Sequence, residues 1–250
     1  MSHLSFIVRH IPNAITCCNL LCGCLSLVFS FGGQPLMACC CIFAATVFDF
    51  FDGFAARSLR VHSSIGKELD SLADMVSFGV APAGIMFFLL LSSMEARGYA
   101  VEMYACGWLL SLPAFIIAVF SALRLAKFNI DPRQTDSFIG LPTPANALFI
   151  SSLAFIVRGD GIAAAIAGNT CFLLAATGVF SFLLLAELPL FSLKFKSFDW
   201  KNNKVRYVFL TLSAVILAIF RCSGLAPVIL LYILLSLSVK ALCHQHKPQK

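Results

Sequence analysis

Long apolar stretches recur along the whole chain, separated by short segments rich in turn-forming or charged residues. Hydrophobic residues make up 60% of the 250 residues and charged residues 12%, whereas a typical soluble domain has about 45–50% and about 25%. An apolar helix of about 20 residues can cross a bilayer. The sequence therefore predicts an all-α, polytopic membrane helical bundle with about eight transmembrane helices, near residues 12–31, 35–56, 70–93, 105–126, 143–158, 169–191, 205–221 and 224–242.

This composition excludes several classes of protein. A secreted disulfide scaffold, a nucleic-acid binder and a cytosolic enzyme with one buried core all need a more polar chain. The 11 cysteines lie mostly in or beside apolar stretches, where Cys behaves as a small hydrophobic residue. Because no internal repeat, low-complexity tract or long linker divides the chain, we expect residues 1–250 to form a single integral-membrane domain.

The positive charges indicate how the bundle is oriented. With eight spans and a cytoplasmic N-terminus, fifteen of the 18 Lys and Arg residues lie on the inner side. The outer side keeps Arg97, Arg158 and Arg221. Cytoplasmic segments of membrane proteins carry such an excess of Lys and Arg, so both termini are predicted to be cytoplasmic.

Four of the 12 acidic residues lie close together at the inner ends of two predicted helices. Asp49 and Asp52 end the second span, and Asp70 and Asp74 begin the third. Spacings of three and four place each pair on one helix face. Since an ionised side chain at membrane depth costs about 2.5–3.5 kcal/mol, a cation must compensate such a cluster. Oxygen ligands favour Mg²⁺ or Mn²⁺, and shared carboxylates are typical of sites with two divalent ions.

Two other interpretations of the aspartates stay open. Arg57 can pair with one carboxylate while the others remain near the aqueous interface, and intramembrane carboxylates also serve ion-coupled transporters. The small residues Gly53, Ala56 and Gly66 suit close helix packing, but beside paired carboxylates and Arg57 they also leave room for a phosphate group.

The spacing of these residues resembles the signature of the CDP-alcohol phosphotransferases. The pattern D-x2-D-G-x2-A-R-x8-G-x3-D-x3-D is met at all eight specified positions: Asp49, Asp52, Gly53, Ala56, Arg57, Gly66, Asp70 and Asp74. The resemblance implies a membrane enzyme that transfers a phosphatidyl or similar group from a CDP-linked donor to an alcohol. It further implies that the four aspartates hold two divalent cations on the donor diphosphate.

The resemblance also implies individual roles within this motif. Asp74 is the candidate general base that takes the proton of the attacking hydroxyl, and Asp70 belongs with it to the catalytic pair. Gly53, Ala56 and Arg57 are expected to shape the cytidine and phosphate pocket, with Gly66 opposite them. No Ser-His-Asp or Cys-His set lies near the cluster in the sequence, which favours direct displacement over a covalent enzyme intermediate.

Three further segments resemble the membrane-embedded phosphatidylserine synthases of this family: I-P-N-A-I-T-C-C-N-L-L-C-G at 11–23, R-L-A-K-F-N at 124–129 and G-L-P-T-P-A-N-A at 140–147. They imply CDP-diacylglycerol as donor and L-serine as acceptor. Relatives that use glycerol phosphate tend to carry Arg where Asn19 stands here. Glycerol phosphate or inositol phosphate as acceptor stays the alternative.

Polar residues in these segments are the remaining candidates for substrate binding. Arg124 is the first choice for the serine carboxylate, with Lys127 beside it and Asn129 as a further polar contact. Ordinary anchoring at the cytoplasmic surface is the alternative for the two cations. Asn13 and Thr16 are candidates for bonds to the CDP moiety, or else for helix capping.

The surroundings of the protein are predicted more coarsely. The substrates and the charge pattern predict an active site facing the cytoplasm, in a membrane that is expected to be a bacterial inner membrane. Membrane lipid is the expected environment, nucleic acid is not an expected partner, and a homodimer is expected from the resemblance alone.

Overall fold

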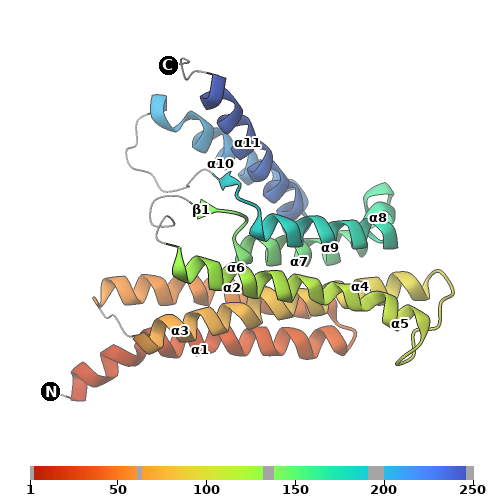
Figure 1. The fold of residues 1–250 in the computed structure, drawn as a ribbon, viewed down its shortest axis with the longest axis horizontal. Helices are drawn as coiled ribbons and strands as arrows, with labels where there is room; N and C mark the ends of the chain where they lie inside the picture. Colours follow the sequence, from red (N-terminus) through yellow and green to blue (C-terminus); the bar gives the residue numbers. More distant parts are fainter. Residues whose placement is uncertain (1–2, 61–63, 132–137, 191–199, 246–250) are drawn as a thin grey trace.

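The computed structural model describes residues 3–60, 64–131, 138–190 and 200–245 (Figure 1). Almost all of these residues are helical. The order is α1 (His3–Phe31), α2 (Pro35–Ser58), α3 (Ser64–Asp74), the π-helix η1 (Met75–Val80), α4 (Ala81–Glu95), α5 (Cys106–Ser111), the 3₁₀ helix η2 (Leu112–Phe115), α6 (Ile116–Ile130), β1 (Phe138–Ile139), α7 (Thr143–Val157), α8 (Ile162–Ala167), α9 (Thr170–Leu185), β2 (Pro189–Leu190), α10 (Trp200–Phe220), the 3₁₀ helix η4 (Arg221–Gly224) and α11 (Leu225–Gln245).

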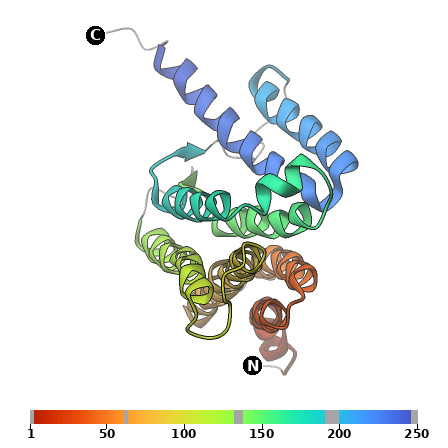
Figure 2. The same cartoon turned by 90° about the vertical axis from the view of Figure 1, so that its right-hand side faces the viewer.

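The helices form two groups along the chain. Helices α1 to α6 run side by side along the long axis, and α7 and α9 lie over them, as the two views of Figures 1 and 2 show. The α10–α11 hairpin packs against α7 and projects obliquely from the bundle. Helix α1 packs chiefly along α2 and also contacts α3 and η1, so the N-terminal half of the chain surrounds the acidic residues.

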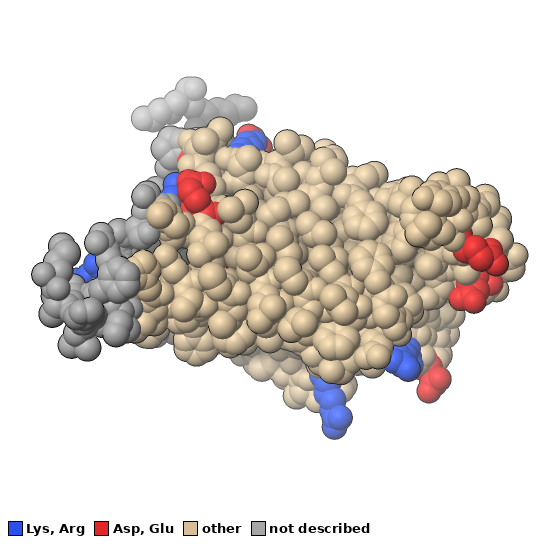
Figure 3. Space-filling view, turned by 90° about the horizontal axis from the view of Figure 1, so that it is seen from below, with Lys and Arg blue, Asp and Glu red and all other residues tan. Residues whose placement is uncertain are grey.

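The surface and the helix lengths agree with a membrane protein. Within the described ranges, five helical segments are long and apolar enough to cross a bilayer: His10–Phe31, Pro35–Ser58, Ile65–Glu95, Cys106–Ile130 and Asn203–Ser238. The last of these contains the α10–α11 hairpin, and α7 and α9 are shorter apolar helices. In Figure 3 a broad uncharged surface separates the charged groups near one end from those toward the other. The predicted all-α membrane bundle is thus confirmed.

Each of the eight predicted spans contains a helix, but several boundaries were wrong. The third span begins at Ser64 rather than near 70 and continues through η1 into α4. The sixth ends at Leu185 rather than at 191, because Pro189 cannot donate a helical hydrogen bond and disfavours helix in the residue before it. Instead, Pro189–Leu190 pairs antiparallel with Phe138–Ile139. The short helix α8 was not predicted.

The core lies where α2, α4, α7 and α9 meet. Ile42, Met86 and Ile150 from three of these helices are fully or almost fully buried. Phe149 of α7 and Phe180 of α9 stack with their ring centroids 3.6 Å apart. Helices α7 and α9 thus pack against α2 and the η1–α4 segment and hold these elements in place.

A close approach of α1 to η1 completes the framework of the site. A Cβ atom added at Gly23 would lie 2.5 Å from Ser77 Oγ and 2.8 Å from Ser77 Cα. Glycine is therefore required at this crossing. One helical turn before each of these residues lie Asn19 and Asp74, so the Gly23–Ser77 contact brings Asn19 beside the acidic residues.

Candidate metal and substrate site

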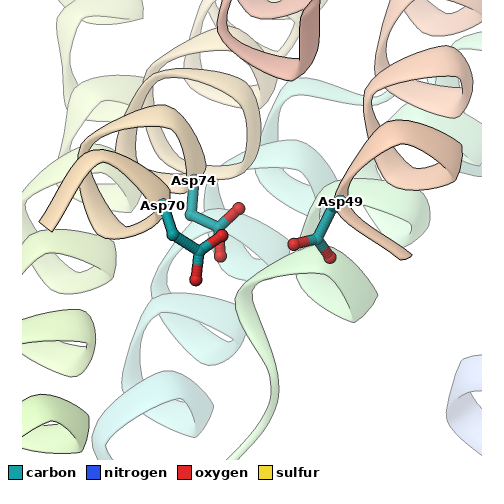
Figure 4. Close-up of side chains that lie close together, drawn as sticks. All are labelled: Asp49, Asp70 and Asp74. Atoms are coloured by element: carbon teal, nitrogen blue, oxygen red, sulfur yellow. The ribbon is translucent and has the colours of Figure 1, made fainter. Parts of the chain in front are cut away.

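Three of the predicted aspartates meet between α2 and α3. Asp49 projects from α2, Asp70 and Asp74 project from the last turns of α3, and their carboxylates point toward one another (Figure 4). Each offers one oxygen atom such that these atoms all lie within 4.8 Å of one another. The helical spacing predicted that Asp70 and Asp74 share a face, and the packing of the two helices adds Asp49 from the neighbouring element.

The chemistry of this group fits a hard divalent cation. All its donors are carboxylate oxygens, the ligands that Mg²⁺ and Mn²⁺ prefer. Oδ1 of Asp70 is buried and has no hydrogen-bond partner among the described residues. Three acidic groups at this distance repel one another, and a bound cation would remove that repulsion. The three carboxylates therefore form a candidate metal site.

Asp52, the fourth predicted ligand, lies outside this group of three. Its side chain is buried, and its Oδ2 accepts a hydrogen bond of 2.7 Å from Thr16 Oγ1 on α1. The same hydroxyl lies 3.0 Å from the carbonyl oxygen of Pro12. Thr16, predicted to bind substrate or cap a helix, thus contacts an acidic residue of the motif. Asn13 lies half-buried one turn before Thr16 on the same helix.

Asn19 is a site residue whose contact with an aspartate was not predicted. Its Nδ2 donates a hydrogen bond of 3.2 Å to Asp74 Oδ1. Its backbone carbonyl accepts a hydrogen bond of 2.9 Å from Ser77 Oγ. An Asn within an apolar span can be recognised in the sequence, and an amide that is buried there needs hydrogen-bond partners. In the structure Asn19 is fully buried. The sequence could not show that the partner is Asp74.

The small residues of the motif lie on the same two helices as the aspartates. Gly53 and Ala56 follow Asp49 and Asp52 along α2, and Gly66 lies one turn before Asp70 on α3. A Cβ atom added at Gly53 would lie 3.4 Å from Nη1 of Arg57. The guanidinium group of Arg57 therefore folds back along α2 toward Gly53, at the exposed end of this helix.

The three candidates on α6 have different surroundings. Arg124 is only 7% exposed, lies over the ring of Phe128 and interacts electrostatically with Asp74, and its Nε is buried without a hydrogen-bond partner among the described residues. Lys127 instead forms an exposed ion pair of 3.1 Å with Glu187. Asn129 donates a hydrogen bond of 2.9 Å to Ser71 Oγ and so joins α6 to α3. Of the three, Arg124 is the best candidate to bind substrate, because it is buried and its Nε has no hydrogen-bond partner among the described residues.

Comparisons with known proteins agree with the geometry. The family model described as CDP-alcohol phosphatidyltransferase matches residues 9–184. A CDP-diacylglycerol–serine O-phosphatidyltransferase of Bacillus subtilis is 38% identical over 148 residues, which are 59% of this chain and 77% of that protein. The protein of the same name from Mycobacterium leprae is 31% identical over 94% of this chain and 72% of its own length. The one from Helicobacter pylori J99 is 36% identical over 56% of this chain and 54% of its own length.

Proposed function

This chain belongs to the CDP-alcohol phosphatidyltransferase family, and from that premise we propose that it transfers the phosphatidyl group of CDP-diacylglycerol to the hydroxyl of L-serine. The products are phosphatidylserine and CMP. The observation that carries this proposal is the meeting of Asp49, Asp70 and Asp74 beside the buried cation Arg124. The names of the similar proteins support serine as the acceptor.

The acidic residues have two tasks in this reaction. Asp49, Asp70 and Asp74 would hold a divalent cation, Mg²⁺ or Mn²⁺. Asp52, which follows Asp49 by three residues on α2, would complete the set for a second ion. When bound, the cations neutralise the negative charge of the donor diphosphate. Asp52 also has a positioning partner, because Thr16 fixes the direction of its carboxylate.

The residues around the carboxylates bind and orient the two substrates. The small residues Gly53, Ala56 and Gly66 are proposed to shape the pocket for the nucleotide part of the donor. Arg57, whose guanidinium group lies beside Gly53, is proposed to balance phosphate charge at the mouth of the site. Asn13 lies three residues before Thr16 on α1, so the two side chains project from neighbouring positions on the same side of the helix. Arg124 binds the carboxylate of serine from α6, whereas Lys127 and Asn129 hold the end of α6 through Glu187 and Ser71.

The transfer itself is a direct displacement at phosphorus. The serine hydroxyl oxygen bonds to the phosphorus atom that bears diacylglycerol, and the bond from that phosphorus to the oxygen shared with the CMP phosphate breaks. CMP leaves with the bonding electron pair, and the hydroxyl proton passes to the Asp74 carboxylate. Holding both substrates beside one base supplies much of the rate, because the reaction becomes effectively intramolecular.

The proposed setting is a membrane with the site at its cytoplasmic face. Most Lys and Arg residues fall on one side of the predicted spans, and the acidic residues lie at the helix ends of that same side. We place the protein in a bacterial inner membrane, as one integral-membrane domain that forms a homodimer. Cross-linking in native membranes tests the dimer.

The proposed reaction is tested with purified protein in detergent. CMP release from CDP-diacylglycerol is measured with Mg²⁺ or Mn²⁺ and, in separate reactions, L-serine, glycerol phosphate or inositol phosphate. We expect release with L-serine to exceed release with either phosphorylated alcohol by at least about tenfold. Release with another acceptor only would retain the family chemistry and overturn serine as the acceptor.

A further inference from the structure

Among the described residues, only one of the two polar side-chain atoms of Asn19 has a hydrogen-bond partner. Its side chain is fully buried, and Nδ2 donates to Asp74 Oδ1 at 3.2 Å. Its Oδ1 is also buried but has no hydrogen-bond partner among the described residues. Native proteins rarely leave such an oxygen without a partner, because burial removes the hydrogen bonds that water would make.

The orientation of this amide follows from its neighbour. A carboxylate accepts hydrogen bonds, so the NH₂ group of Asn19 must face Asp74 and the carbonyl oxygen must point away from that contact. Asn19 cannot easily swing aside, since Ser77 Oγ donates to its backbone oxygen and Gly23 lets α1 lie directly on η1. The acceptor oxygen is therefore held in a fixed place beside Asp74.

Arg124 provides the opposite chemistry from another helix. Its Nε is a buried donor without a hydrogen-bond partner in the described part of the chain, and its guanidinium group is attracted to Asp74. Helices α1 and α6 both contact η1, which begins directly after Asp74. Asp74, the candidate base, thus has two neighbours whose polar atoms lack a hydrogen-bond partner among the described residues. One is the acceptor Oδ1 of Asn19 on α1, and the other is the donor Nε of Arg124 on α6.

A zwitterionic amino acid has an ammonium group, which needs a hydrogen-bond acceptor, and a carboxylate, which needs a donor. We propose that Asn19 determines acceptor specificity, its Oδ1 accepting a hydrogen bond from the ammonium group of the amino-acid acceptor while its Nδ2 positions Asp74 at the hydroxyl. This inference rests on the proposed function. It adds a ligand for the amino group, a role that the proposed function gives to no other residue.

The test compares three acceptors that differ by one group. L-Serine has both charged groups, 3-hydroxypropionate lacks the ammonium group, and L-serine methyl ester lacks the carboxylate. For the wild-type protein we expect kcat/KM to be at least about tenfold higher for L-serine than for 3-hydroxypropionate, because a site built to bond a polar group rejects an analogue that lacks it. Equal values for the two would overturn the inference without any variant.

The variant Asn19→Leu should remove this discrimination. We expect its ratio of kcat/KM for L-serine over 3-hydroxypropionate to fall at least about fivefold. Its ratio of L-serine over the methyl ester should stay as in the wild type. Asn19→Ala serves as a second variant if the Asn19→Leu protein fails to fold. Binding of Mn²⁺, measured directly, reports separately on the positioning of Asp74.

Two further variants distinguish a loss of acceptor specificity from a general loss of activity caused by disturbed packing. Ser77→Ala removes the bond to the Asn19 backbone but keeps the Asn19 side chain, so it should lower activity with all acceptors and change the L-serine over 3-hydroxypropionate ratio less than Asn19→Leu does. Arg124→Gln should change the methyl ester ratio and leave the 3-hydroxypropionate ratio alone. An active Asn19 variant that keeps the wild-type ratio would overturn the inference only. Absence of serine-dependent CMP release by folded wild-type protein would overturn the proposed function and, with it, this inference.

Discussion

At the scale of single residues, Asp74 has the most specific environment of the acidic group. It receives a hydrogen bond from Asn19, is attracted by Arg124 and shares the candidate metal site with Asp49 and Asp70. We expect Asp74→Asn to lower kcat by about 10²- to 10⁴-fold, the range for loss of a general base. Asp160→Asn, an exposed aspartate between α7 and α8, is the matched control and should keep full activity. CMP release measures both, and an Asp74→Asn enzyme with wild-type kcat would remove Asp74 from the reaction.

Thr16 provides a second prediction at this scale. Thr16→Val keeps the shape of the side chain but removes the hydrogen bond to Asp52, which leaves a buried carboxylate without that donor. Loss of a hydrogen bond to a charged group costs about 1.5–3 kcal/mol, so both thermal stability and activity should fall. In the matched control Thr177→Val, the lost hydroxyl donates to the backbone oxygen of Leu173 in its own helix. Equal melting temperatures for the two variants would contradict the role given to Thr16.

At the scale of helices, the crossing of α1 and η1 sets the geometry of the site. Gly23→Ala would bring a methyl group within 2.8 Å of the Ser77 backbone, so the two helices must separate and Asn19 must move from Asp74. Overpacking of this kind costs about 1–3 kcal/mol. We expect a lower melting temperature and a lower kcat. Gly178→Ala in α9 is the matched control, since a Cβ there meets nothing within 4 Å. A fully active, equally stable Gly23→Ala protein would contradict this account.

The helices were largely predictable from the sequence, whereas their contacts were not. Apolar stretches identified every long helix but not the short helix α8, and several helix ends differed from the prediction. Regular spacing placed Asp70 and Asp74 on one face. The bonds from Thr16 to Asp52 and from Asn19 to Asp74 join residues 36 and 55 positions apart. They depend on how α1 packs against α2 and α3, which no pattern along one helix encodes.

At the scale of the whole molecule, orientation is the first prediction. The excess of Lys and Arg on one side of the predicted spans predicts that both termini are cytoplasmic. Fluorescent-protein fusions at either terminus should therefore fluoresce, and alkaline phosphatase fusions at the same points should be inactive. An active alkaline phosphatase fusion at either terminus would contradict the predicted orientation and the eight-span topology together.

Cation binding should also change the stability of the whole protein. A ligand that binds the folded state raises stability by about 2.7 kcal/mol at a hundred times its Kd, so Mg²⁺ or Mn²⁺ should raise the melting temperature and EDTA should reverse the effect. Asp70→Asn should abolish this rise. In metal-free buffer the same variant should melt at or above the wild-type temperature, because it removes repulsion among three crowded carboxylates. A wild-type-sized cation effect in Asp70→Asn would exclude this residue from the metal site.

We propose that the carboxylates between α2 and α3 catalyse a cation-dependent transfer of a phosphatidyl group to serine. It is tested most directly by incubating purified protein with CDP-diacylglycerol and radiolabelled L-serine and counting the label in the organic phase. We expect labelled lipid with Mg²⁺ or Mn²⁺, none with EDTA, and a loss of at least about a hundredfold in Asp74→Asn. Folded wild-type protein that forms no labelled lipid with either cation, or labelled lipid formed equally by Asp74→Asn, would contradict it.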